Sequence, residues 1–268
     1  MTIAPATSLE PRLRAGRDAG RKLLVPYVTA GMDGAWLDVL AAISEAGADA
    51  IEIGLPFSDP MVDGPVIQRA SQQALARGVT PASVLADVRR SEAGVPLVVM
   101  TYYNLVFRMG ERRMASSLEE AGISGAVVPD LPLEECGTWC AEADSVDLAT
   151  VLLVAPSTPR ERAARICDRS RGFLYAVGRM GVTGEQSELA ASAIEVAGTS
   201  RALTDLPVLV GIGVSTPGQA AQACEAADGV VVGSALVRRL LDGGGPEGAA
   251  KFVGELRAAL DGARSAGG

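Results

Sequence analysis

Glu52 has the clearest capacity for chemistry, because of the segment that carries it. It lies in the run Asp49-Ala-Ile-Glu-Ile-Gly54, whose aliphatic pattern predicts a buried strand. Side chains alternate along a strand, so Glu52 shares one face with Ala50 and Gly54, while the branched face opposite suits packing against helices. A carboxylate on an inward face is costly unless it has a partner or a chemical task. No Lys or Arg lies within any strand predicted below, so we favour proton transfer over the alternative, an internal ion pair.

The absence of histidine narrows the chemistry that is open to this chain. It excludes Ser-His-Asp hydrolysis, Cys-His proteolysis and every His-ligated metal site. Proton transfer must therefore fall to carboxylates, Tyr, Lys or Cys. The irregular spacing of the cysteines predicts reduced thiols and no zinc site; they are Cys136, Cys140, Cys167 and Cys224.

Glycines at the ends of three later strands indicate a place for an anion. Gly211 and Gly213 end one predicted strand, Gly233 and Ser234 end the next and open a short helix, and Gly184 follows the strand before them. Glycine lets the backbone approach a ligand closely, and the N–H groups of a helix N-terminus attract negative charge. Ordinary turns are the alternative, but three converging sets favour a phosphate-containing small molecule.

Short aliphatic runs alternate with amphipathic stretches along the whole chain, which is typical of repeated βα units. Eight such units favour a closed (β/α)8 TIM barrel of parallel strands over an open doubly wound sheet. An extra N-terminal helix within residues 1–20 is expected to cover the bottom of the barrel, and Pro246–Arg264 to form the last outer helix, in one domain spanning 1–268. The predicted strands are Leu24–Ala30, Ala48–Gly54, Pro96–Thr101, Ala126–Pro129, Leu148–Val154, Phe173–Val177, Pro207–Gly211 and Gly229–Gly233.

Charge and hydropathy limit the partners and the location of the protein. The formal net charge is −8 and no Lys/Arg stripe is present, so we expect no nucleic-acid partner. No stretch resembles a secretion signal, and none is long and apolar enough to span a membrane, so a cytoplasmic location is expected.

A loop of 14 residues, Leu55 to Gln68, follows the strand of Glu52 and carries Asp59 and Asp63. The run from Glu52 to Pro65, Glu-Ile-Gly-Leu-Pro-Phe-Ser-Asp-Pro-Met-Val-Asp-Gly-Pro, resembles the signature of the tryptophan synthase alpha family. The resemblance extends from about Leu24 to the last helix. It includes the segments at residues 26–31, 102–107, 128–132, 155–159, 181–184, 210–215 and 232–236.

The resemblance implies a retro-aldol cleavage of indole-3-glycerol phosphate into indole and glyceraldehyde 3-phosphate, without metal or organic cofactor. It implies that Glu52 is the general acid and base, and that Asp63 accepts a hydrogen bond from the indole N–H as positive charge develops on the ring. Tyr175 is expected close to the glutamate as a third catalytic residue, with a core aromatic as the alternative. Tyr102 either packs against the substrate ring or orders the loop.

For the substrate phosphate, the resemblance implies binding at Gly184, Gly211, Gly213, Gly233 and Ser234. Some other positions depart from the family pattern. Ile212 stands where an aromatic residue commonly contacts the ring, and Gly178 stands where a small hydroxyl residue is more frequent. These departures bear on the ring pocket and on a lid over residues 178–184 more than on the type of reaction.

A pyridoxal-phosphate-dependent beta subunit that takes up the indole, in an alpha2beta2 assembly, is the partner that the resemblance implies. The apolar residues Pro56, Phe57, Pro60 and Met61 indicate where it would dock. A stand-alone lyase that releases free indole and a non-catalytic barrel that activates a beta-type partner are the alternatives. A Schiff-base aldolase would require a lysine within a strand, which is absent.

Overall fold

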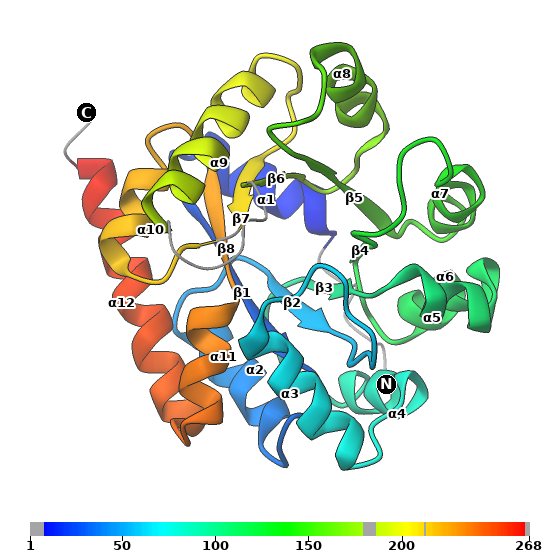
Figure 1. The fold of residues 1–268 in the computed structure, drawn as a ribbon. Helices are drawn as coiled ribbons and strands as arrows, with labels where there is room; N and C mark the ends of the chain where they lie inside the picture. The colour runs from blue at the N-terminus through cyan, green and yellow to red at the C-terminus, as the bar shows by residue number, and fades with distance from the viewer. Residues whose placement is uncertain (1–7, 179–185, 212, 266–268) are drawn as a thin grey trace.

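The computed structural model describes residues 8–178, 186–211 and 213–265. Eight parallel strands pair in chain order, and the last pairs with the first, which closes a barrel surrounded by helices (Figure 1). The strands are β1 (Leu23–Thr29), β2 (Ile51–Gly54), β3 (Leu97–Met100), β4 (Gly125–Val127), β5 (Ala149–Val154), β6 (Leu174–Val177), β7 (Val208–Gly211) and β8 (Gly229–Val232).

One helix precedes the first strand, and the others follow the strands and cover the outside of the barrel. They are α1 (Leu9–Asp18), α2 (Trp36–Glu45), α3 (Pro65–Ala76), α4 (Pro81–Val88), α5 (Tyr103–Met109), α6 (Glu111–Glu120), α7 (Gly137–Asp144), α8 (Arg160–Arg169), α9 (Gln186–Arg201), α10 (Pro217–Ala223), α11 (Ser234–Leu241) and α12 (Gly245–Ser265).

The predicted barrel is confirmed, and all eight predicted strands are present within three residues of their expected bounds. The largest difference lies in the second strand, which begins at Ile51 and not at Ala48. Asp49 explains this difference, because its side chain takes part in pairing the two strands. The Asp49 carboxylate accepts a hydrogen bond from the Leu24 N–H at 2.8 Å, and the Asp49 N–H donates to the Leu24 carbonyl at 2.8 Å.

The long loop after the second strand is shorter than the sequence predicted. Helix α3 begins at Pro65 and takes up the last residues of the expected loop. Proline is favoured at the first helical position, because the N–H that it lacks would have no partner there. The loop that remains, residues 55–64, is therefore held at one end by β2 and at the other by α3.

The interior of the barrel is a column of aliphatic side chains, closed at its lower end by α1. Val25, Val98 and Val231 from three strands belong to this column, and Leu9 and Leu13 of α1 pack against it with no more than 1% of their surface exposed. The predicted N-terminal helix at the bottom of the barrel is therefore confirmed. A second and larger cluster of apolar residues lies between the strands and the outer helices.

Within the part of the chain that the structure describes, no helix combines the length and the apolar character needed to cross a membrane. The four cysteines are free and buried, in agreement with the expected reduced thiols.

Candidate active site

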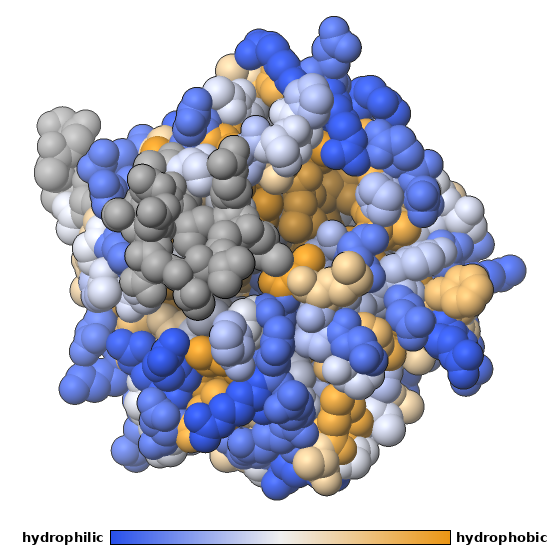
Figure 2. Space-filling view, in the orientation of Figure 1, coloured by the Kyte–Doolittle hydropathy of each residue, from blue (hydrophilic) through white to orange (hydrophobic). Residues whose placement is uncertain are grey.

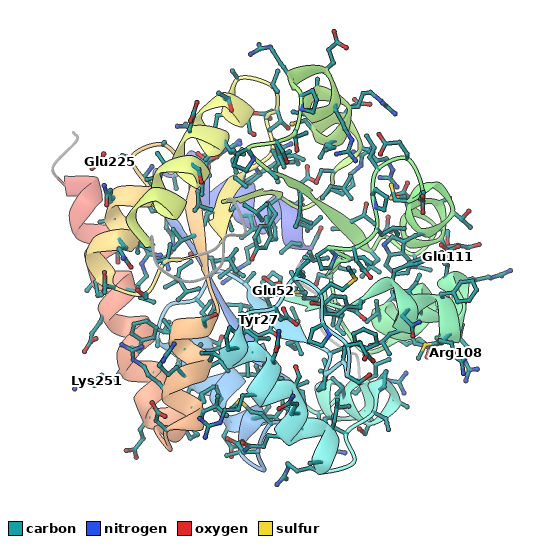
Figure 3. All side chains as sticks on the ribbon, in the orientation of Figure 1. Tyr27, Glu52, Arg108, Glu111, Glu225 and Lys251 are labelled. Atoms are coloured by element: carbon teal, nitrogen blue, oxygen red, sulfur yellow. The ribbon has the colours of Figure 1, made fainter. Side chains whose placement is uncertain are left out.

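Glu52 projects from β2 into the barrel near its upper end. Its neighbour in β1 is Tyr27, and Figure 3 shows the two side chains close together near the middle of the strand ring. Glu52 is fully buried, and neither of its carboxylate oxygens has a hydrogen-bond partner among the described residues. Burial, and secondarily the charge of Asp63, raises the pKa of Glu52 to about 8. At neutral pH the group is therefore mostly protonated and able to donate a proton.

Asp63 lies at the end of the loop that follows β2, just before α3. The loop is fastened there by the Gln68 side chain, whose Nε2 donates to the Asp63 carbonyl at 2.8 Å. Burial raises the pKa of Asp63, and a hydrogen bond from the Tyr102 hydroxyl acts in the opposite direction. The charge of Asp63 contributes to the raised pKa of Glu52, so the two expected carboxyl groups lie within electrostatic range of each other.

Two tyrosines lie over glycines of the neighbouring strands. A Cβ atom on Gly54 would lie only 1.8 Å from the Tyr27 hydroxyl oxygen, and one on Gly211 only 2.1 Å from Cε1 of Tyr175. The absence of a side chain at each glycine therefore gives the phenol room at the barrel mouth. Burial is the main reason that the pKa of Tyr175 is raised. The negative charges of Glu52 and Asp63 raise it further.

Sequence reasoning missed Tyr27, although a signal for it was present. Thr29 follows two residues later, and a polar residue on the same strand face near the strand end indicates that this face meets the ligand space. Burial, followed by the charge of Asp63, raises the pKa of Tyr27, so that its phenol keeps its proton.

Tyr102 lies at the end of β3, directly before α5, and only 3% of its surface is exposed. Its ring stacks on that of Phe57 with centroids 5.0 Å apart, and its hydroxyl oxygen accepts a hydrogen bond from the Val62 N–H at 3.2 Å. The sequence left two roles open for Tyr102, packing against the substrate ring or ordering the loop. The contacts in the structure are with the loop.

The expected phosphate-binding residues lie at the ends of adjacent strands. Gly213 follows β7 with φ +86°, which favours glycine, while Gly233 precedes α11 and Ser234 is its first residue. Since β7 pairs with β8, these backbone groups reach one edge of the mouth. Gly211 lies lower, beneath the Tyr175 ring. Gly184 and Ile212, and most of the expected lid, lie outside the described residues.

The arrangement suits acid–base chemistry on an apolar substrate that carries an anionic group. Two carboxyl groups stand in different environments, one fully buried and the other on a half-buried loop, and such a difference assigns them different tasks. In Figure 2 apolar side chains are recessed near the middle of the face and polar ones surround them at its edge. Among the described residues, no group of His, Cys, Asp or Glu side chains could hold a metal ion.

Comparison with known proteins agrees with this geometry. Residues 13–259 match the family described as "Tryptophan synthase alpha chain". The alpha chain of Streptomyces coelicolor is 44% identical over 257 residues, which cover 94% of each chain, and that of Methanosarcina mazei is 46% identical over 230 residues, which cover 85% of this chain and 84% of the relative.

Solved structures give the same result. A Mycobacterium tuberculosis tryptophan synthase structure superposes with a TM-score of 0.86 at 42% identity, covering 94% of this chain and 97% of the other. The tryptophan synthase alpha subunit of Legionella pneumophila gives a TM-score of 0.84 at 31% identity, with 97% and 100% covered. The chain belongs to the tryptophan synthase alpha chain family.

Proposed function

We propose that this chain cleaves indole-3-glycerol phosphate into indole and glyceraldehyde 3-phosphate, the lyase reaction of its family, with Glu52 and Asp63 as the catalytic carboxyl groups. The observation that carries the assignment of residues is the burial of Glu52 at the barrel mouth, with its pKa raised to about 8 and Asp63 acting on the same space. A buried acid of this kind can both give and take a proton near neutral pH.

The protonated Glu52 carboxyl donates its proton to C3 of the indole ring, which leaves positive charge on the ring nitrogen. Asp63 stabilises that charge by accepting a hydrogen bond from the N–H group. The Glu52 carboxylate then takes the proton of the adjacent glycerol hydroxyl, the bond between C3 and the side chain breaks, and its electron pair restores the aromatic ring. Glu52 ends the cycle protonated, as it began.

The remaining expected residues bind the substrate in this proposal. Gly184, Gly211, Gly213, Gly233 and Ser234 surround the phosphate, where glycines and the N-terminus of α11 favour an anion. At the other end of the substrate, Ile212 borders the indole ring, and Tyr102 orders the loop that carries Asp63. Tyr175, close to Glu52, completes the catalytic set. The adjacency of β7 and β8 and the position of Ser234 at the start of α11 support the phosphate assignment.

We further propose a tryptophan synthase beta subunit as the partner of this chain, in an alpha2beta2 complex in the cytoplasm. Two large apolar side chains support a contact surface on the outside of the mouth: Met61, 83% exposed on the loop that carries Asp63, and Phe107, 68% exposed on α5. Of the other apolar residues expected there, Pro56 is buried and Phe57 is half-buried against Tyr102.

The test is to incubate the purified chain with indole-3-glycerol phosphate and measure indole, with and without a cognate beta subunit. We expect slow indole release by the chain alone and a severalfold or larger increase with the partner, because docking on the loop favours the ordered state. Indole release that the partner leaves unchanged would support a stand-alone lyase. The absence of indole in both arms would overturn the catalytic assignment.

A further inference from the structure

Tyr102 contacts both ends of the loop that carries Asp63. Its ring stacks on Phe57 near the beginning of the loop, at an interplanar angle of 26°, and its hydroxyl group meets the Val62 N–H near the end. A single side chain thus holds two points that are five residues apart along the loop. Between them lies Met61, whose side chain is 83% exposed.

The hydrogen-bonding capacity of the Tyr102 hydroxyl is used in both directions. Its oxygen accepts from the Val62 N–H, which leaves the O–H free to donate, and the Asp63 carboxylate receives that hydrogen bond. Because the donor is a neutral phenol, the hydrogen bond orients Asp63 without placing a positive charge beside the carboxylate.

Tyr102 is itself held firmly. The preceding Thr101 N–H donates to the Val127 carbonyl at 3.0 Å, and the following Tyr103 N–H donates to the Asp130 carboxylate at 2.8 Å. The backbone around Tyr102 is therefore fixed to the end of β4, whereas Asp63 lies on a loop. The contact between Tyr102 and the loop therefore restricts the movement of Asp63 relative to the barrel.

We propose that Tyr102 is a positioning residue for this reaction, whose ring and hydroxyl clamp residues 57–63 so that the Asp63 carboxylate faces the ring nitrogen of the substrate. The inference rests on the proposed role of Asp63 and adds a second one: Tyr102 acts through Asp63 and not by its own contact with the substrate. A misplacement of about 1 Å in a catalytic group can cost on the order of 10²-fold in rate.

The variant Tyr102→Phe tests the clamp, since it keeps the ring on Phe57 and removes only the hydroxyl. We expect kcat for indole release by the chain alone to fall by about 10- to 100-fold, while KM changes by less than about threefold. The melting temperature should stay close to that of the wild type. Tyr103→Phe is the matched control, because it also loses one hydrogen bond, to Glu111 at 3.0 Å, and should leave kcat unchanged.

A double-mutant cycle with Asp63→Asn separates this inference from the proposed function. If Tyr102 acts through Asp63, the double variant should be no slower than Asp63→Asn alone. Losses that multiply would overturn the clamp and indicate a direct contact between Tyr102 and the substrate. Wild-type kcat in Tyr102→Phe would overturn it as well, whereas full activity of Asp63→Asn would overturn the proposed role of Asp63.

Discussion

At the scale of single residues, Glu52 and Asp63 show how two chemically similar groups acquire different tasks. Glu52 is enclosed by the barrel and has no hydrogen-bond partner among the described residues. Asp63 lies on the loop above it and receives a hydrogen bond from Tyr102. Desolvation favours the neutral form of Glu52, and the proximity of Asp63 strengthens this preference.

The substitution Glu52→Gln should reduce indole release by roughly 10²- to 10⁴-fold or more, because an amide can neither donate nor accept the transferred proton. The measurement is a steady-state assay of the chain alone, with the melting temperature as a check of the fold. The exposed Glu225 on the periphery gives a matched control, since Glu225→Gln makes the same exchange of a carboxyl group for an amide away from the mouth (Figure 3). Turnover close to that of the wild type in Glu52→Gln would exclude the acid–base role.

The same substitution should stabilise the protein at alkaline pH. The pKa of Glu52 is raised from 4.5 to about 8 on folding. Below pH 4.5 the group is protonated in both states, so its ionisation does not lower the free energy of unfolding. Between pH 4.5 and 8 the unfolded chain ionises while the folded one keeps its proton, and the free energy of unfolding falls by about 1.4 kcal/mol per pH unit.

Thermal unfolding at several pH values measures this effect. Wild type and Glu52→Gln should melt within about 2 °C of each other at pH 5, and the variant should melt about 5 °C or more above the wild type at pH 8.5, since 1 kcal/mol corresponds to about 2–4 °C in a protein of this size. A difference that does not change with pH would mean that Glu52 is solvated in the folded state.

At the scale of the elements, the seam between β8 and β1 closes the barrel. Gly229 lies opposite Leu23 there, and a Cβ atom added to Gly229 would lie 2.4 Å from the Leu23 carbonyl oxygen. Backbone cannot move away as a flexible side chain can, so a methyl group at this position would force the two strands apart.

We therefore expect Gly229→Ala to destabilise the protein by about 1–3 kcal/mol or more, measured by chemical denaturation. Gly218→Ala in α10 is the control, because a Cβ atom there meets nothing within 4 Å and alanine favours a helix. Equal stability of the two variants would show that the seam adapts to the added methyl group.

The strands could be predicted from the sequence, because short aliphatic runs separated by glycines and polar residues recur through the chain. The helices α5 and α7 could not. The first, Tyr103–Met109, is a short aromatic-rich helix of about two turns. The second, Gly137–Asp144, begins with glycine and lacks a clear apolar stripe. The helical conformation of both segments depends on their packing between strands more than on their own residue pattern.

The candidate site could be predicted where one residue type was out of place, and not where it was ordinary. A carboxylate within a strand drew attention to Glu52, while tyrosine is an ordinary residue type in a strand, and the polar Thr29 on the same face was a weaker signal for Tyr27. The contacts of Tyr102 with Phe57 and Val62 join parts of the chain about 40 residues apart and have no signature in local sequence.

At the scale of the whole molecule, the exposed apolar side chains lie outside the mouth that carries the two carboxyl groups. We expect Phe107→Ser to weaken binding of a cognate beta subunit about tenfold or more, because a large aromatic side chain is a typical anchor of an interface. Indole release by the chain alone should stay unchanged. The measurement is a titration by calorimetry together with the assay, and unchanged binding would place the contact elsewhere.

The helix that closes the bottom of the barrel also constrains the order of folding. Leu9 packs closely against Gly125 and Gly172, and the Glu10 carboxylate accepts a hydrogen bond from the Gly172 N–H at 2.9 Å. The residues of α1 are thus made before their binding partners, which lie more than a hundred positions later in the chain. We expect α1 to dock as a late step, after the strands that form its binding site, although it is made before them.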